Sequence, residues 1–176
     1  MFDKLVDFLL NFIEDVLPLV IVKEYDRGVH FRGGKFLKIV EPGICWKIPF
    51  LDKVETRTVV TTTLSIPTQS LTTKDGKQIV AKAVVKYNIS SIKDVILEVY
   101  DPVDAISDTT QAIIKEQVTS RAWEDVTDNE TDNTITKKVR VEVKKWGINV
   151  EKVTLTDIGI IKSLRLFNEM SNIVNG

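Results

Sequence analysis

The sequence predicts a mixed fold in which strands fill the first half of the chain and helix follows. From Ile79 to Ile89, small and apolar side chains alternate with polar ones, as in a strand with one buried face. Asp75-Gly76 lies between two extended runs, which is a strong signal for a β-hairpin. After residue 101 the apolar residues recur at helical spacing, so the period changes where the strands end.

The composition limits the chemistry that the chain can perform. Its 176 residues, 43% of them hydrophobic, can bury one sizeable core and form one domain with appendages. The net charge of −1 gives no overall attraction to nucleic acid or to acidic lipid, and no nucleic acid is expected as a partner. A single cysteine, Cys45, excludes an intrachain disulfide and is typical of a reducing compartment. A single histidine, His30, leaves little from which to build a metal site or a catalytic triad, so neither enzyme activity nor a cofactor is expected.

The first segment of the chain has the pattern of an amphipathic helix. Between residues 2 and 17, polar side chains recur at steps of three and four, and apolar side chains fill the opposite side. Pro18 ends this helix because proline lacks an amide donor and disfavours helix in the preceding residue. The apolar side predicts contact with a membrane through Phe2, Leu5, Leu9, Phe12, Ile13, Val16 and Leu17.

Two alternatives for this segment stay open. Its acids oppose a spanning helix, which needs about 20 largely uncharged residues, and its start lacks the basic residues and small-residue cleavage site of a signal peptide. The segment could lie in the membrane interface, or its apolar side could pack on the domain or on a neighbouring subunit. The acidic polar side slightly disfavours the lipid alternative, because interfacial helices are usually rich in Lys and Arg.

Short strands alternate with turns in the next part of the chain. The apolar runs at residues 19–22 and 29–31 have the composition of strands. Gly33-Gly34 and Pro42-Gly43 are turn sequences that separate such runs. Residues 53–66 are rich in Thr and Val, which is the composition of extended chain.

Helix is expected in the second half. Asp101 suits an N-cap position, and apolar residues at helical spacing extend this helix to about Glu124. The polar segment 129–133 is expected to be a connection. Residues 135–146 fit two structures, because apolar residues at steps of two favour a strand, whereas those at steps of four and Gly147 as a C-cap favour a helix. Periodicity alone favours the strand.

Several stretches resemble the band 7 family of stomatin, prohibitin and flotillin, and above all its stomatin-like branch. EYDRGV at residues 24–29 and RGGKF at residues 32–36 resemble the family's opening strand and turn, and residues 41–54 resemble its next segment. The longest match is ETRTVVTTTLSIPTQSLTTKDG at residues 55–76, and residues 146–158 resemble the closing strand. These matches extend over nearly the whole body of the chain.

The resemblance implies an α+β domain at residues 19–160, with a curved, mostly antiparallel sheet and packed helices. It favours helix for residues 135–146. The domain would follow an amphipathic membrane-associating helix at residues 1–18 and precede a short C-terminal helix at residues 161–176. Two features depart from the family: the N-terminal apolar segment is short and charged, and the chain ends without the long charged coiled coil. Small or weakly associated oligomers are therefore expected.

The resemblance also implies a function. We expect a non-enzymatic scaffold on the cytoplasmic side of a membrane, which binds membrane lipids, oligomerises alone or with other band 7 proteins, and organises client membrane proteins or lipid domains. Trp46 and Phe50 are expected either to enter the membrane interface or to close the core. The alternative function is a soluble regulator that docks on a larger band 7 protein or on a membrane protease.

Three hypotheses of a specific chemical function are less favoured than a structural role for the same residues. Cys45 could be acylated, but a buried small hydrophobe is favoured. Residues 28–35 superficially resemble a phosphate-binding loop, but Gly34 separates Gly33 from the lysine and Phe36 follows where Ser or Thr is needed. For His30, the sequence nominates no nucleophile beside it, so a structural role is favoured.

Overall fold

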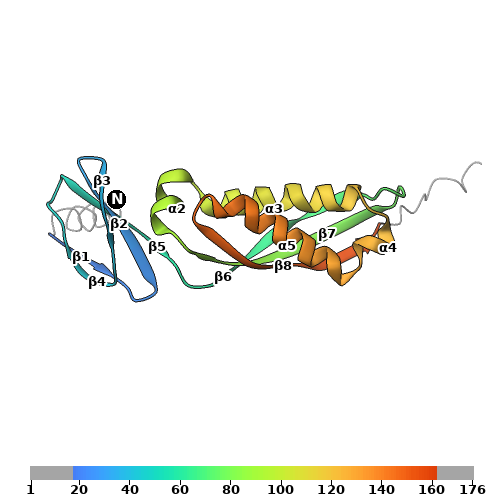
Figure 1. Ribbon diagram of the computed structural model, residues 1–176, viewed down its shortest axis with the longest axis horizontal. Coiled ribbons are helices and arrows are strands. Elements are labelled where there is room, and N and C mark those ends of the chain that lie inside the picture. The colour runs from blue at the N-terminus through green and yellow to red at the C-terminus, as the bar shows by residue number, and fades with distance from the viewer. Residues whose placement is uncertain (1–17, 162–176) are drawn as a thin grey trace, which may run out of the picture.

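The computed structural model describes residues 18–161, which form two parts arranged end to end (Figure 1). One part is a small unit of five strands, and the other is a three-stranded sheet with helices on one face. The two parts meet where α2 (Ile92–Glu98) contacts β2 (Asp26–Arg32). The elongated molecule therefore has the small unit at one end and α4 (Trp123–Val126) near the other.

The small unit contains two antiparallel sheets. β1 (Leu19–Val22) pairs with β4 (Gly43–Trp46), and β2 lies between β3 (Lys35–Val40) and β5 (Asp52–Thr58). The turns predicted between these strands are confirmed. The side chains that pack together between the two sheets are Val20, Val22, Val40, Cys45 and Val54.

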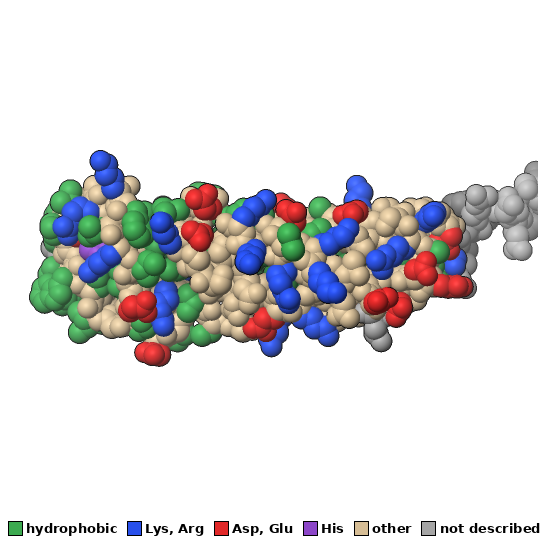
Figure 2. Space-filling view, in the orientation of Figure 1, with side chains coloured by type: hydrophobic (Ala, Val, Ile, Leu, Met, Phe, Trp, Pro, Cys, Tyr) green, Lys and Arg blue, Asp and Glu red, His purple; other side chains and the backbone are tan. Residues whose placement is uncertain are grey.

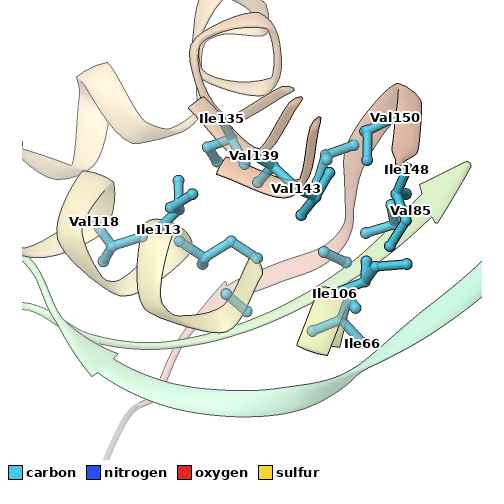
Figure 3. Close-up of a cluster of buried hydrophobic side chains, with 14 of the residues drawn as sticks. Ile66, Val85, Ile106, Ile113, Val118, Ile135, Val139, Val143, Ile148 and Val150 are labelled. Carbon is cyan, nitrogen blue, oxygen red and sulfur yellow. The ribbon is translucent and has the colours of Figure 1, made fainter. Parts of the chain in front are cut away.

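The larger part is built on a third antiparallel sheet. β6 (Thr62–Thr72), β7 (Gln78–Ile89) and β8 (Ile148–Ile160) lie in the order β6-β7-β8. α3 (Pro102–Thr119) packs on β6, and α5 (Asn129–Lys144) packs on β8. Figure 3 shows how apolar side chains from the strands and from both helices meet in the core between them. The predicted alternation of β7 is confirmed, because its buried residues Ile79, Ala81, Ala83 and Val85 belong to this core.

The predicted hairpin is confirmed between β6 and β7. Gly76 has a φ of 78°, which glycine adopts without the clash of a Cβ atom. The Asp75 carboxylate accepts hydrogen bonds from the Thr73 hydroxyl at 2.6 Å and from the Trp123 amide at 3.1 Å. The hydrogen bond from Thr73 is the main reason that the pKa of Asp75 falls to about 2, and the Lys77 ammonium adds to it. The hairpin turn is thus fixed to the start of α4.

α3 begins as predicted but ends earlier. The Asp101 carboxylate accepts hydrogen bonds from the amides of Val103 and Asp104, which confirms the N-cap. The helix stops at Thr119 rather than at about Glu124. The Arg121 carbonyl accepts a hydrogen bond from the Lys74 amide of the hairpin. Just after the helix ends, the backbone therefore bonds to the hairpin instead of continuing the helical pattern. The sequence patterns do not predict the short α2.

α5 settles the ambiguous region. The connection expected at residues 129–133 is wrong, because α5 begins at Asn129. The strand favoured by periodicity is wrong as well, and the helix implied by the resemblance is confirmed. Ile135, Val139 and Val143, at steps of four, are fully buried, whereas Val141 is 72% exposed. An exposed valine on the outer side of the helix therefore produced the misleading alternation.

α5 also covers the free edge of β8. Three of its polar side chains, four residues apart, bond to the backbone of that strand. The Asp132 carboxylate accepts from the Leu155 amide at 3.2 Å, and the Thr136 hydroxyl accepts from the Val153 amide at 2.9 Å. The Arg140 guanidinium donates to the carbonyls of Val150 and Glu151 at 2.7 and 2.8 Å. These bonds satisfy groups that an edge strand would otherwise leave unpaired.

The described residues confirm the α+β class with antiparallel strand pairing. They form three separate sheets rather than one curved sheet. The helices predicted at residues 1–18 and 161–176 fall almost entirely outside the described residues, so both stay predictions. Within residues 18–161, none of the helices combines the length and the apolar character needed to cross a membrane.

Candidate functional site

Trp46 and Phe50 are the two predicted contact residues that the structure describes. Their exposed fractions are 71% and 84%, so neither side chain closes the core. The other predicted contact residues belong to the segment 2–17, outside the described residues. Trp46 ends β4, and Phe50 lies in the loop that follows.

Trp46 belongs to a larger apolar surface on the sheet of β1 and β4. Leu19 lies opposite Trp46, and Ile21 lies opposite Ile44. Directly opposite residues of an antiparallel pair project from the same face, so these four side chains share one face, and all four are exposed. Their neighbours Val20 and Cys45 point to the other face, into the core of the small unit.

The loop after β4 extends this surface, because its apolar side chains are also exposed. We call the seven exposed residues the apolar tip: Leu19, Ile21, Ile44, Trp46, Ile48, Phe50 and Leu51. Figure 2 shows hydrophobic side chains gathered at this end of the molecule. Soluble monomers rarely expose large contiguous apolar patches, so the apolar tip indicates a binding surface.

The loop that carries Phe50 has a fixed conformation. Phe50 has a φ of 64°, a left-handed value that a bulky residue adopts only when its surroundings impose it. The Asp52 amide donates to the Ile48 carbonyl, and the Ile48 amide donates to an Asp52 carboxylate oxygen, both at 2.9 Å. The Gly33 amide donates to the Leu51 carbonyl at 2.9 Å. The loop is thus held to the turn between β2 and β3.

Asp52 is the buried anchor of this loop. Its carboxylate accepts two hydrogen bonds from the Arg32 guanidinium, at 2.8 and 2.9 Å, and His30 Nε2 lies 2.9 Å from the same group. The guanidinium of Arg32, with the Ile48 amide and His30, holds the pKa of Asp52 well below its usual range. An ionised, fully paired carboxylate therefore fixes the loop at neutral pH.

Sequence patterns miss five residues of the apolar tip: Leu19, Ile21, Ile44, Ile48 and Leu51. Residues 19–22 are apolar throughout, so no alternation separates an inner from an outer face. One signal could have identified them. When both faces of a strand are apolar and the unit is too small to bury both, one apolar face must be exposed.

The other candidate residues have structural roles. Cys45 is buried, as the favoured hypothesis predicts. Residues 28–35 form most of β2, the hairpin turn and the first residue of β3, rather than the strand–loop–helix of a phosphate-binding loop. His30 packs beside Asp52 in the small unit. Across residues 18–161, no group of three or more potential ligands from His, Cys, Asp and Glu could hold a metal ion.

Comparisons with known proteins agree on one family. The model of the SPFH domain / band 7 family matches residues 20–166. An uncharacterised protein of Methanocaldococcus jannaschii is 35% identical over 149 residues, which cover 81% of this chain and 73% of the relative. A stomatin homologue of Pyrococcus horikoshii is 29% identical over 154 residues, 86% of this chain and 57% of the relative. Stomatin-2 of Caenorhabditis elegans is 29% identical over 145 residues, 78% of this chain and 38% of the relative.

The matched region contains the whole described structure apart from its first two residues. The chain spans less than three-fifths of the length of these two stomatin-type relatives. It includes both the small unit with the apolar tip and the sheet with its helices. The chain belongs to the SPFH domain / band 7 family.

Proposed function

We propose that this protein is a non-enzymatic scaffold that attaches to a membrane through the apolar tip. Band 7 proteins are typically membrane-associated scaffolds, and stomatin-type relatives support the same role for this chain. The observation that carries the proposal is the set of seven exposed apolar side chains at one end of the molecule. Cys45, the single cysteine and a free thiol, supports the cytoplasmic side of that membrane.

The chemistry of the tip suits a bilayer interface. Moving a large apolar side chain from water into an apolar environment stabilises binding by about 1.5–3 kcal/mol. Tryptophan is enriched at membrane–water interfaces because its ring is apolar and its N–H can stay hydrated. The fixed loop around Phe50 lowers the conformational entropy lost on insertion, because the side chain is already presented outward.

Residues 2–17 give the membrane a second contact in this proposal. Their apolar side would lie in the interface through Phe2, Leu5, Leu9, Phe12, Ile13, Val16 and Leu17, joined by Pro18 to the start of β1 at the tip. The two contacts would act together, because binding of one raises the effective concentration of the other at the membrane. The body would then carry contacts with sister subunits, other band 7 proteins and client membrane proteins.

Flotation of the full chain with lipid vesicles tests this proposal. We expect the parent to float, and the double variant Trp46→Ser with Phe50→Ser to bind at least about tenfold more weakly, because two apolar groups are lost. Tyr100→Ser with Val141→Ser is the matched control, since both side chains are strongly exposed but lie outside the small unit. The control should float like the parent.

The outcomes separate the alternatives. A parent that stays at the bottom of the gradient overturns the membrane function and favours the soluble regulator. If the tip variant floats as well as the parent, the tip is not the anchor. In that case Leu9→Asp with Phe12→Asp, which places charges on the apolar side of residues 2–17, tests the remaining contact.

A further inference from the structure

The charges around the apolar tip are distributed unevenly. The strand ends and turns that adjoin the tip are residues 31–38 and 46–54, and they carry five basic residues: Arg32, Lys35, Lys38, Lys47 and Lys53. Asp52 is the one acid in these two segments, and its side chain is fully buried against Arg32. The charge that these segments present to solvent is therefore positive. Figure 2 shows Lys and Arg side chains beside the hydrophobic end.

One backbone hydrogen bond and the strand register place basic residues beside the loop of the apolar tip. The turn between β2 and β3 is flanked by Arg32 and Lys35, which lie opposite each other, and its Gly33 amide bonds to the Leu51 carbonyl. Lys53 lies opposite Phe31 on the strand that leaves the same loop, and its side chain is 75% exposed. It also contacts Glu55 at 2.7 Å, one position beyond these segments. Basic side chains thus border the loop that presents Phe50 and Leu51.

The acids of the small unit lie mainly at the opposite ends of its strands. Glu24 is in the turn between β1 and β2, Asp26 is the first residue of β2, and Glu41 follows the end of β3. Glu41 pairs with Arg27 at 2.6 Å, and Asp26 accepts a hydrogen bond from the Thr58 hydroxyl at 2.8 Å. Five of the eight Lys and Arg residues of the small unit thus lie in the segments beside the apolar tip, whereas Lys23, Arg27 and Arg57 lie toward the end that carries these acids.

From this geometry we infer that the tip binds anionic lipid surfaces in preference to neutral ones. This inference rests on the proposed attachment of the tip to a membrane. Apolar side chains would enter the interface while Lys35 and Lys53 remain at the level of the headgroups, where anionic lipids hold a negative surface potential. Residues 1–17 cannot supply this attraction, because they carry four acids and one lysine. A chain with a net charge of −1 would thus bind a negatively charged membrane through a local positive surface.

Vesicle binding at low and high salt tests the inference on the full chain. We expect vesicles of phosphatidylcholine with phosphatidylserine to bind the parent on the order of tenfold more tightly than phosphatidylcholine alone. Raising the salt concentration should remove most of this difference, because salt screens exposed charges. Lys35→Gln with Lys53→Gln should lose the preference and keep the binding to phosphatidylcholine.

Two matched variants make the result specific. Lys35→Arg with Lys53→Arg keeps both charges and should keep the preference. Lys137→Gln with Lys152→Gln removes two exposed lysines from the larger part and should also keep it. Equal binding of the parent to both vesicles at low salt overturns the inference and leaves membrane attachment standing. If the parent binds neither kind of vesicle, both the inference and the proposed membrane attachment are overturned. If the Lys137 and Lys152 variant loses the preference for anionic vesicles, the preference comes from the net charge of the chain rather than from the tip, which also overturns the inference.

Discussion

At the scale of single residues, Asp52 connects the interior of the small unit to its exposed surface. One carboxylate accepts hydrogen bonds from Arg32 and from the Ile48 amide, and it lies against His30. The sequence does not predict that His30 and Asp52 lie together, because 22 positions separate them and no local pattern joins them. Only the pairing of β2 with β5 brings them together.

Replacing this carboxylate should destabilise the fold in a pH-dependent way. The pKa of Asp52 is lower in the folded protein than its ordinary value of 3.8, so its ionised form stabilises the fold above about pH 4. That contribution disappears as the pH falls through the folded pKa. Asp52→Asn should therefore unfold at lower urea concentration than the parent at neutral pH. The difference between the two unfolding free energies should narrow steadily below about pH 4. Urea melts of both proteins at several pH values measure this difference. A difference that stays constant into strong acid would contradict the role of the ionised Asp52 carboxylate.

At the scale of helices and strands, the elements with local signals are the ones that the sequence predicts. The hairpin at Gly76 and the start of α3 at Asp101 depend on residues close together in the chain, so their patterns are sufficient. α5 could not be assigned from its valines, because Val141 is apolar yet exposed. The exposed face of β1 could not be assigned either, since its direction depends on which sheet covers the other face.

The edge of β8 gives an element-scale prediction. Thr136→Val keeps a β-branched side chain but leaves the buried Val153 amide without its acceptor, which should cost about 1–3 kcal/mol of unfolding free energy. Thr134→Val is the matched control, because among residues 18–161 the Thr134 hydroxyl bonds to the Glu130 carbonyl of its own helix and to no group of β8. Urea melts give the energies, and amide hydrogen exchange at Val153 should accelerate only in the Thr136 variant. Equal losses in both variants would show that α5 does not secure this edge.

At the scale of the whole molecule, both the shape and the charge distribution support attachment through the apolar tip. The small unit and the helical part lie end to end, so the apolar tip and α4 are far apart (Figure 1). The overall net charge of −1 conceals a positive end, because the small unit, residues 18–60, carries eight Lys and Arg residues against five Asp and Glu. Composition describes the average of the chain, whereas binding depends on which side chains the fold gathers at one end. An end-on attachment to the membrane would leave the larger part free for other proteins.

Tryptophan depth in vesicles tests this attachment most directly. The chain has three tryptophans, of which Trp46 is in the apolar tip and Trp123 begins α4 near the opposite end. Variants that keep one of them, with phenylalanine at the other two positions, are bound to vesicles that contain brominated lipids, which quench indole fluorescence on contact. We expect strong quenching and a blue shift for Trp46 and no change for Trp123. An unquenched Trp46, or equal quenching of both residues, would contradict end-on attachment through the tip.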